Sequence, residues 1–177
     1  MNSMYPKKTQ ASKAPPNGSS HPAEALKRGR RIEVRQSGIH GKGVFAKVPI
    51  AAGERIMEYT GAVITWKEAQ RRHPHDPSDP NHTFYFHIDD KRVIDGAENG
   101  NSAKWINHSC GPNCEADQDD EEGRVFINAI KDIAPGEELN YDYGLILEGR
   151  HTAKVKKEFE CRCGAPECRG TMLAPKR

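Results

Sequence analysis

The sequence predicts a mainly β fold with few short helices, and three observations support this. Stretches with strand-like composition are short, and Gly, Pro or Asp residues interrupt them, which is typical of small sheets joined by turns. Only two stretches have helical features. The chain has 177 residues and an apolar fraction of 35%, which suits one domain with a modest core and a tail.

Six segments are expected to form strands. The first, Ile32-Glu33-Val34-Arg35, alternates apolar and charged residues, as a strand with one buried face does. The others are rich in the β-branched and aromatic residues that favour strands, and they cover residues 44–46, 55–59, 84–88, 92–95 and 124–130.

Helices are expected in two places. The stretch Thr65-Trp66-Lys67-Glu68 has the spacing of a capping box, which predicts a helix from residue 66 to about residue 72. Prolines at positions 74, 77 and 80 then predict a loop. A second helix is expected over residues 148–157, and the acidic run 117–122 is expected to be a mobile loop tip.

Charge is distributed unevenly along the chain, although the net charge is only +2. Residues 1–48 contain ten Lys or Arg and two Asp or Glu, residues 49–149 contain nine and twenty, and residues 150–177 contain eight and three. An acidic middle suits a Lys/Arg-rich peptide substrate, and basic ends suit possible contact with nucleic acid. Residues 1–28 are rich in Pro, Lys, Ser, Ala and Gly and are expected to form a disordered basic tail.

No apolar run approaches the roughly eighteen residues of a membrane span, and no apolar segment follows the basic start as in a secretory signal. We therefore expect an intracellular protein without membrane contact, either cytoplasmic or associated with chromatin or a nucleoid.

Three cysteines near the end of the chain predict a metal site. Cys161, Cys163 and Cys168 fall within eight residues, and clustered thiols in an intracellular protein favour metal over disulfides. Structural zinc takes four tetrahedral ligands, so the fourth is Cys110 or Cys114, and spacing leaves that choice open. Unconnected thiols, or one disulfide in an oxidising setting, are the alternatives.

The stretch from Asn107 to Asn113, Asn-His-Ser-Cys-Gly-Pro-Asn, invites comparison with a Cys–His nucleophile. We discount that reading, because near neighbours on an extended segment rarely face each other and no third group is evident. A more informative pair is Tyr141 and Tyr143. Two tyrosines one residue apart on a strand point to the same face, which predicts two hydroxyls side by side in one pocket.

Taken in order, these motifs resemble the SET-domain protein lysine methyltransferases over residues 30–173, and the middle part is most similar to the trithorax type. The matching motifs are Gly41-Lys42-Gly43, Glu58-Tyr59-Thr60-Gly61, Asn107 to Asn113, Glu138 to Gly144 and the cysteine-rich post-SET segment. The small size resembles stand-alone bacterial members.

The resemblance implies a β-clip fold of small curved sheets around a pseudoknot, with a SET domain over residues 29–147 and a zinc-binding post-SET segment over residues 148–177. It also implies S-adenosylmethionine as methyl donor and zinc held by Cys110, Cys161, Cys163 and Cys168. The donor would contact Lys42, Gly43, Asn107, His108 and Tyr143.

The same resemblance assigns catalytic roles to Tyr143, Tyr141 and Tyr59 and a substrate channel to Tyr59, Phe84 and Tyr141. The implied activity is methyl transfer to a lysine amine of a basic protein, such as a histone or nucleoid protein, and mainly monomethylation, because the Tyr141 hydroxyl would crowd a methylated amine. The alternative is a non-catalytic SET module that binds a lysine-containing partner or chromatin.

Overall fold

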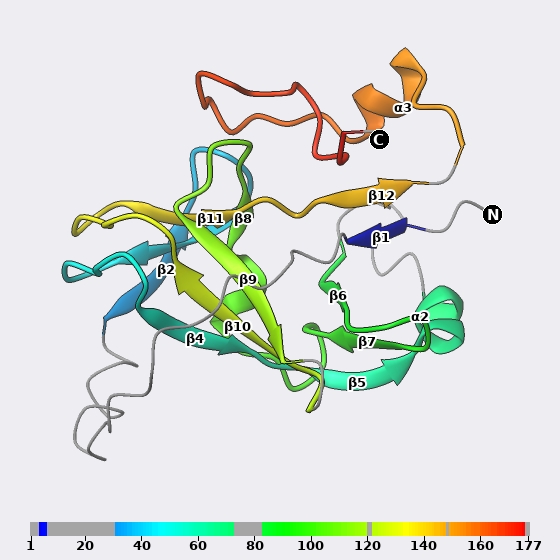
Figure 1. Ribbon diagram of the computed structural model, residues 1–177, viewed down its shortest axis with the longest axis horizontal. Coiled ribbons are helices and arrows are strands. Elements are labelled where there is room, and N and C mark those ends of the chain that lie inside the picture. Colours follow the sequence, from blue (N-terminus) through cyan, green and yellow to red (C-terminus); the bar gives the residue numbers. More distant parts are fainter. Residues whose placement is uncertain (1–3, 7–30, 73–82, 120–121, 148, 176–177) are drawn as a thin grey trace.

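Four small sheets and three short helical elements make up the structure, a computed structural model that describes residues 4–6, 31–72, 83–119, 122–147 and 149–175 (Figure 1). The sheets have strand orders β4-β10-β9, β2-β3-β11-β8, β5-β7-β6 and β1-β12. The mainly β fold class is therefore confirmed. The strands are β1 (Met4–Pro6), β2 (Ile32–Gln36), β3 (Lys42–Ala46), β4 (Arg55–Tyr59), β5 (Ala62–Thr65), β6 (Tyr85–His87), β7 (Arg92–Asp95), β8 (Asn107–His108), β9 (Cys114–Asp119), β10 (Arg124–Ala129), β11 (Glu138–Tyr141) and β12 (Leu145–Leu147).

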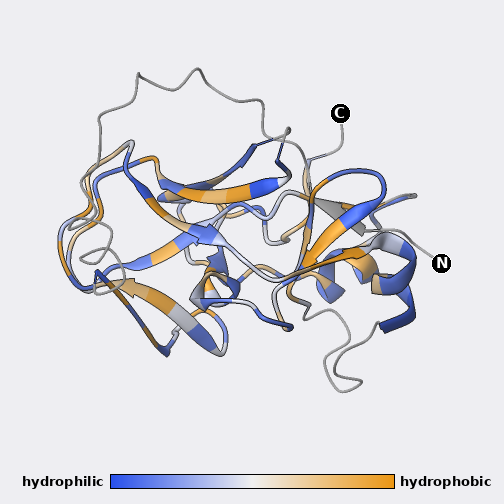
Figure 2. Cartoon of the chain, turned by 90° about the horizontal axis from the view of Figure 1, so that it is seen from below, coloured by the Kyte–Doolittle hydropathy of each residue, from blue (hydrophilic) through white to orange (hydrophobic). Residues whose placement is uncertain are grey.

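The main core lies where the inward faces of three sheets meet. Figure 2 shows hydrophobic stretches along the strands, interrupted by polar turns. Val44 of β3, Val125 and Ile127 of β10 and Leu139 of β11 are fully buried in this core. A second, smaller cluster joins Leu147 to Phe159 and Leu173 of the C-terminal segment. Apolar burial therefore contributes to holding the C-terminal segment against β12.

Two segments far apart in the sequence lie side by side at the centre of the fold. Strand β8 pairs in parallel with β11, with Asn107 opposite Asn140 and His108 opposite Tyr141. Asn113 adds two bonds across the same junction: its Oδ1 accepts from the Asn140 N–H at 2.9 Å, and its Nδ2 donates to the Glu138 carbonyl at 2.9 Å. This is the contact between the two motifs that the expected pseudoknot requires.

The helices agree with the sequence in one case and differ in the other. Helix α2 (Trp66–Arg72) begins as predicted, and the Thr65 hydroxyl accepts from the Glu68 N–H at 3.2 Å, which is one half of the capping box. Helix α3 (Ala153–Glu158) begins later than residue 148. Gly149 has a φ of 90°, which breaks helical geometry, and Thr152 caps the helix by accepting from the Val155 N–H. The 3-10 helix η1 (Ser102–Trp105) lies between β7 and β8.

Two segments expected to be irregular contain strands. Residues 117–119 of the acidic run belong to β9, because all six residues of β9 pair with β10 and the chain turns only after Asp119. Residues 4–6 of the expected disordered tail form β1, which pairs antiparallel with β12. The rest of that tail and the proline-rich loop over residues 73–82 lie outside the described residues.

Candidate active site and metal centre

A cavity of about 1180 Å³ lies between the SET motifs and the C-terminal segment. Its walls include Lys42, Asn107 and His108 of the expected donor side. They also include all four residues expected in catalysis and the lysine channel, namely Tyr59, Phe84, Tyr141 and Tyr143. Residues from four of the motifs, together with Phe84, thus converge on one concave space, as residues of a binding site do.

Three tyrosines form an aromatic wall of this cavity. The rings of Tyr141 and Tyr143 lie 4.9 Å apart between centroids, although Tyr143 lies beyond the end of β11. The Tyr143 hydroxyl donates to the Ile106 carbonyl at 2.8 Å, and the Tyr59 hydroxyl donates to the Phe84 carbonyl at 2.8 Å. Each of these two rings is therefore held at its hydroxyl end by a backbone acceptor.

Burial keeps the three phenols neutral. It is the largest effect on each and raises the pKa of Tyr59, Tyr141 and Tyr143 above the ordinary value for tyrosine. Phe86, which the sequence analysis did not assign, completes the wall, with its centroid 5.4 Å from that of Tyr59 and 6.4 Å from that of Tyr141. The cavity therefore offers hydroxyl groups and aromatic faces without a formal charge from these residues.

The expected donor side is built around the Asn107 amide. Its Nδ2 donates to the Glu138 carboxylate at 2.8 Å and to the Lys42 carbonyl at 3.0 Å, and it lies 3.2 Å from the His40 carbonyl. Glu138 also accepts from the Ser37 hydroxyl at 2.8 Å. The Asn107 side chain is thus used to hold the Gly-Lys-Gly turn, while its main chain belongs to β8, which pairs with β11.

The two glycines of that turn have different surroundings. Gly41 lines the cavity and has a φ of 48°, which favours glycine. A side chain at Gly43 would overlap the Glu138 carboxylate, so packing against Glu138 requires glycine there. Sequence reasoning gave Glu138 no role, although a carboxylate within the apolar alternation of β11 was an available signal.

Two ammonium groups flank an aromatic ring beside the turn. Lys42 Nζ lies 4.8 Å and Lys104 Nζ 5.4 Å from the Trp105 ring centroid, within the range of cation–π attraction. All three residues line the cavity. Trp105 also packs edge-on against Phe84 at 5.0 Å between centroids. This corner therefore joins positive charge on the donor side to the aromatic channel.

Four cysteine sulfurs gather at one point beside the cavity. The Sγ atoms of Cys110, Cys161, Cys163 and Cys168 all lie within 4.8 Å of one another, and those of Cys110 and Cys161 are 3.7 Å apart. Tetrahedral zinc with bonds of about 2.3 Å places thiolates about 3.8 Å apart, so the four residues fit this ion. Cys114 instead begins β9 and is fully buried in the core, which decides the choice that spacing left open.

Backbone amides donate to three of these sulfurs. The N–H groups of Cys110, Arg169 and Gly170 point at Cys163, Cys110 and Cys168 Sγ, respectively, each at 3.4 Å. Burial acts to raise the pKa of Cys163, but the N–H groups of Cys110 and Ala165 outweigh it and lower the value to about 6. Zinc binds thiolate, but burial raises the pKa of Cys110 and Cys161, so the fit rests on the positions of the four sulfurs.

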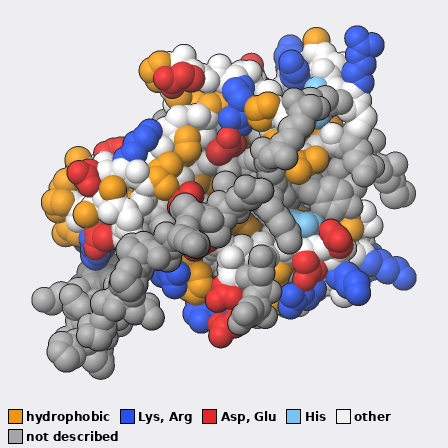
Figure 3. All heavy atoms as spheres, in the orientation of Figure 1, with side chains coloured by type: hydrophobic (Ala, Val, Ile, Leu, Met, Phe, Trp, Pro, Cys, Tyr) orange, Lys and Arg blue, Asp and Glu red, His pale blue; other side chains and the backbone are white. Residues whose placement is uncertain are grey.

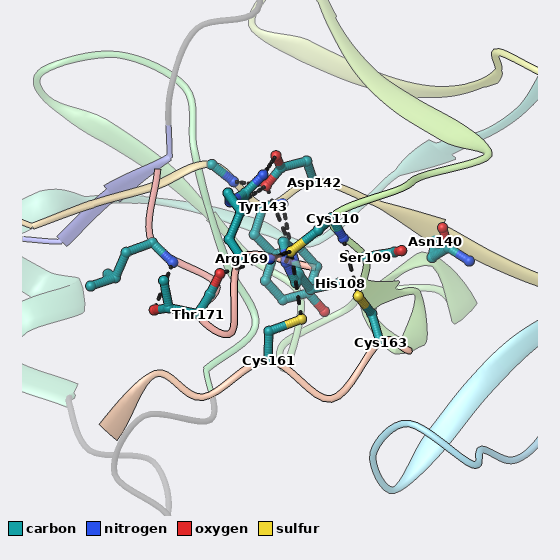
Figure 4. Close-up of polar contacts among 12 residues, drawn as sticks. His108, Ser109, Cys110, Asn140, Asp142, Tyr143, Cys161, Cys163, Arg169 and Thr171 are labelled. Atoms are coloured by element: carbon teal, nitrogen blue, oxygen red, sulfur yellow. Dashed lines mark hydrogen bonds and ion pairs between the residues drawn. The ribbon is translucent and has the colours of Figure 1, made fainter. Parts of the chain in front are cut away.

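His108 and Cys110 face each other, contrary to the argument that near neighbours on an extended segment do not. His108 Nε2 lies 3.4 Å from Cys110 Sγ, because residues two apart on an extended chain point to the same side (Figure 4). Burial lowers the pKa of His108 to about 4, with Asp142 opposing. The Cys–His pair still does not form a nucleophile site, since Cys110 belongs to the four-sulfur group.

The C-terminal segment forms one wall of the cavity, and Cys161 belongs both to this wall and to the four-cysteine group. Phe159, Cys161 and Met172 line the cavity from this side. Arg169 fastens the segment to the SET motif, with both Nη atoms on the Asp142 carboxylate at 2.7 and 2.9 Å. Sequence reasoning missed Arg169, whose position directly after Cys168 was the available signal.

In the part of the chain that the structure describes, no helix has the length and apolar character needed to cross a membrane.

Comparison with known proteins agrees with this architecture. The SET domain family profile matches residues 41–144. A histone-lysine N-methyltransferase, ATX2, of Arabidopsis thaliana is 37% identical over 147 residues, which cover 81% of this chain and 13% of the relative. An H3 lysine-4 specific histone-lysine N-methyltransferase of Candida albicans is 38% identical over 149 residues, covering 82% of this chain and 14% of the relative.

A third relative, the histone H3-lysine(4) N-trimethyltransferase ATX1 of Arabidopsis thaliana, is 38% identical over 147 residues, covering 81% of this chain and 13% of the relative. The chain therefore spans less than one sixth of the length of these curated relatives. The family profile covers more than half of the chain and includes the turn at Gly41, the Asn107 segment and Tyr143. Together with the β-rich fold and the convergence of these motifs on one cavity, this shows that the chain belongs to the SET-domain family.

Proposed function

We propose that the chain transfers a methyl group from S-adenosylmethionine to the side-chain amine of a lysine in a basic protein. The observation that carries this proposal is the convergence of Tyr59, Tyr141 and Tyr143 with Lys42, Asn107 and His108 on one cavity. The names of its relatives specify histone lysines, which favours a histone or histone-like substrate.

The aromatic channel addresses the main chemical obstacle, which is that lysine is protonated near pH 7. With an ordinary lysine pKa of ~10.4, supplying the neutral amine costs about 4–5 kcal/mol. A desolvated channel lowers this pKa because burial disfavours the ammonium form. The neutral phenols of Tyr59, Tyr141 and Tyr143 bring no negative charge that would stabilise the ammonium.

In the transfer itself, a bond forms between the lysine nitrogen and the methyl carbon while the bond from that carbon to the donor's sulfur breaks. The sulfur leaves as a neutral thioether, and the lysine nitrogen loses a proton to solvent before attack. Holding amine, methyl and sulfur in line is a proximity effect worth several kcal/mol. Tyr143 is proposed to orient the amine and the polarised methyl, because its hydroxyl is fixed at the cavity wall beside Ile106.

Lys42 and Lys104 are proposed to face the carboxylate of the donor's amino-acid part. Both ammonium groups lie over the Trp105 ring at the donor side of the cavity, where they bring positive charge close to this carboxylate. The main-chain groups of Asn107 and His108 are proposed to contact the donor as well, since both residues line the cavity beside Lys42.

Tyr141 is proposed to limit the product mainly to monomethyllysine. Its side chain is buried beside Tyr143, where its hydroxyl would crowd an amine that already carries a methyl group. The name of one relative specifies trimethylation, so the number of methyl groups in the product is a sharp test of this assignment.

Zinc bound by Cys110, Cys161, Cys163 and Cys168 would supply a structural cross-link. It would fix the C-terminal segment, and with it Phe159 and Met172 in the cavity wall, by joining it to the Asn107 segment.

The surface gives limited support for charge-based substrate selection. Figure 3 shows acidic and basic side chains interspersed over one face rather than separated by sign. Several acidic residues of the middle region are paired, as in the bonds of Glu58 with Arg124 and Asp89 with Arg92. We therefore place substrate selection in the cavity and its rim, and we propose contact of the basic ends with nucleic acid as a separate property.

The deciding experiment is transfer of labelled methyl from S-adenosylmethionine to a histone mixture, followed by mass spectrometry of the modified lysine. Predominant monomethyllysine is expected, and predominant trimethyllysine would refute the role given to Tyr141. Donor binding without transfer to any protein would favour the alternative of a non-catalytic module that binds a lysine-containing partner.

A further inference from the structure

The His108 side chain connects the metal centre to the backbone of Tyr143. His108 is 3% exposed. Its Nδ1 accepts from the Tyr143 N–H at 3.1 Å, and its Nε2 lies 3.4 Å from Cys110 Sγ. Figure 4 shows the imidazole between the cysteine group and the chain leading to Tyr143. One buried ring thus contacts a predicted metal ligand on one side and the predicted catalytic residue on the other.

The Tyr143 amide determines which nitrogen of the His108 ring carries the proton. A backbone amide can only donate, so Nδ1 must carry a lone pair, and the proton of the neutral ring lies on Nε2. That proton points at Cys110 Sγ. A metal-bound thiolate is a good acceptor for it, whereas a free thiol is a weak one. Metal binding at the cysteines therefore strengthens the bond that fixes the ring.

Tyr143 depends on this ring because its amide has no partner in a sheet. Strand β11 ends at Tyr141, and the Tyr143 N–H donates to His108 Nδ1 instead of to a neighbouring strand. The two rings also meet edge-on, with centroids 5.3 Å apart. At its other end Tyr143 is fixed by the Ile106 carbonyl. A shift of the imidazole would therefore tilt the phenol about its hydroxyl anchor.

Two further groups face His108 from the neighbouring segment. Asp142 Oδ1 lies 3.5 Å from Nδ1 and is engaged by the Arg169 guanidinium. The backbone N–H of Arg169 donates to Cys110 Sγ. The C-terminal segment thus holds Cys110 Sγ through a main-chain bond and fixes Asp142 beside Tyr143 through the Arg169 guanidinium.

We propose that His108 is a positioning residue whose side chain transmits metal occupancy of the Cys110 group to the orientation of Tyr143. This rests on the proposed function for the role of Tyr143, but the link itself is a physical coupling that exists with or without catalysis. A merely space-filling His108 would stabilise the fold without making the Tyr143 amide respond to metal.

Two substitutions test the contact of His108 with Tyr143 and its contact with Cys110 separately. His108→Asn keeps an acceptor near the Nδ1 position and cannot reach Cys110, whereas His108→Gln keeps a donor near the Nε2 position and places no acceptor at Nδ1. His151→Gln is the matched control, since His151 contacts the Leu147 carbonyl instead. Circular dichroism confirms that each variant is folded.

The first measurements need no methyl donor or substrate. Metal affinity, from competition with a chelator, is expected to fall about 10–100-fold in His108→Asn and to stay within about threefold of the parent in His108→Gln. Hydrogen exchange of the Tyr143 amide is expected to slow on zinc loading in the parent and in His151→Gln. In both His108 variants this response to zinc is expected to disappear.

An unchanged response of the Tyr143 amide to zinc in both His108 variants would overturn the proposal. If neither variant folds, the parent loaded with ¹¹³Cd is studied by NMR instead. The His108 Hε2 signal must then show coupling to cadmium across the bond to Cys110. Absence of this coupling would also overturn the proposal. Failure of the proposed function is a different result, namely no methyl transfer by the parent. Where transfer occurs, His108→Gln is expected to lose kcat with little change in the KM of the donor.

Discussion

The Tyr143→Phe substitution removes one oxygen atom from the cavity and leaves the ring in place. The lost hydroxyl donates to the Ile106 carbonyl at 2.8 Å, and Ile106 is 1% exposed. Loss of the bond and the unpaired carbonyl together cost about 1–2 kcal/mol of unfolding free energy, which corresponds to a fall in Tm of about 3–8 °C for a domain of this size. Since a typical domain has about 5–15 kcal/mol of stability, the variant stays folded at 25 °C.

The catalytic loss is expected to be much larger than this. Removing one fixed hydrogen-bonding group that acts on the transition state costs about 10²–10³ in kcat. Initial rates with labelled donor and histones, thermal unfolding and calorimetric donor binding therefore separate the two effects. A variant whose rate stays within about threefold of the parent would refute the role of Tyr143. Tyr59→Phe is an informative comparison, because its hydroxyl also donates to a backbone carbonyl at 2.8 Å.

Three further outcomes are expected. Tyr141→Phe widens the site beside the amine and should shift the product toward di- and trimethyllysine by mass spectrometry, and an unchanged product distribution would argue against the crowding mechanism. Cys110→Ala should lose the bound zinc measured by elemental analysis, whereas Cys114→Ala should keep one zinc per chain, because its sulfur packs in the core. Gly100→Ala should lower Tm by several degrees, since a methyl group would overlap the Gly96 carbonyl at a cost of about 1–3 kcal/mol. The control Gly38→Ala should leave Tm nearly unchanged, because the space around Gly38 is open.

Local patterns predicted those parts of the fold that local interactions determine. Helix α2 begins at its capping box, as expected, because the Thr65 hydroxyl and the Glu68 amide are three residues apart. Helix α3 and strand β9 were placed less well. The acidic composition of residues 117–119 predicts a loop, but pairing with β10 across the turn at Gly123 stabilises a strand there. This pairing depends on the partner strand rather than on the composition of the segment itself.

The candidate site also contains some features that sequence spacing predicts and others that it does not. Three cysteines were evident from their spacing, but the fourth ligand lies more than fifty residues away in the chain, and its identity depends on which sulfur turns away from the core. Likewise, the bond from Ser37 to Glu138 joins residues 101 positions apart, and the pair of Arg169 with Asp142 joins two motifs that no spacing relates. Such contacts follow from the topology that brings β8 beside β11, which sequence periodicity does not specify.

For the Asn-His-Ser-Cys stretch, the nucleophile reading was rightly discounted, but for a geometric reason that is wrong. His108 and Cys110 do contact each other, so the argument that dismissed their pairing was wrong. Cys110 is not a nucleophile, because its sulfur is grouped with those of three further cysteines. The other nitrogen of His108 accepts from the amide of Tyr143, which lies beyond the end of β11. A buried amide needs an acceptor, and here that need places the metal centre and the predicted catalytic tyrosine on opposite sides of a single imidazole.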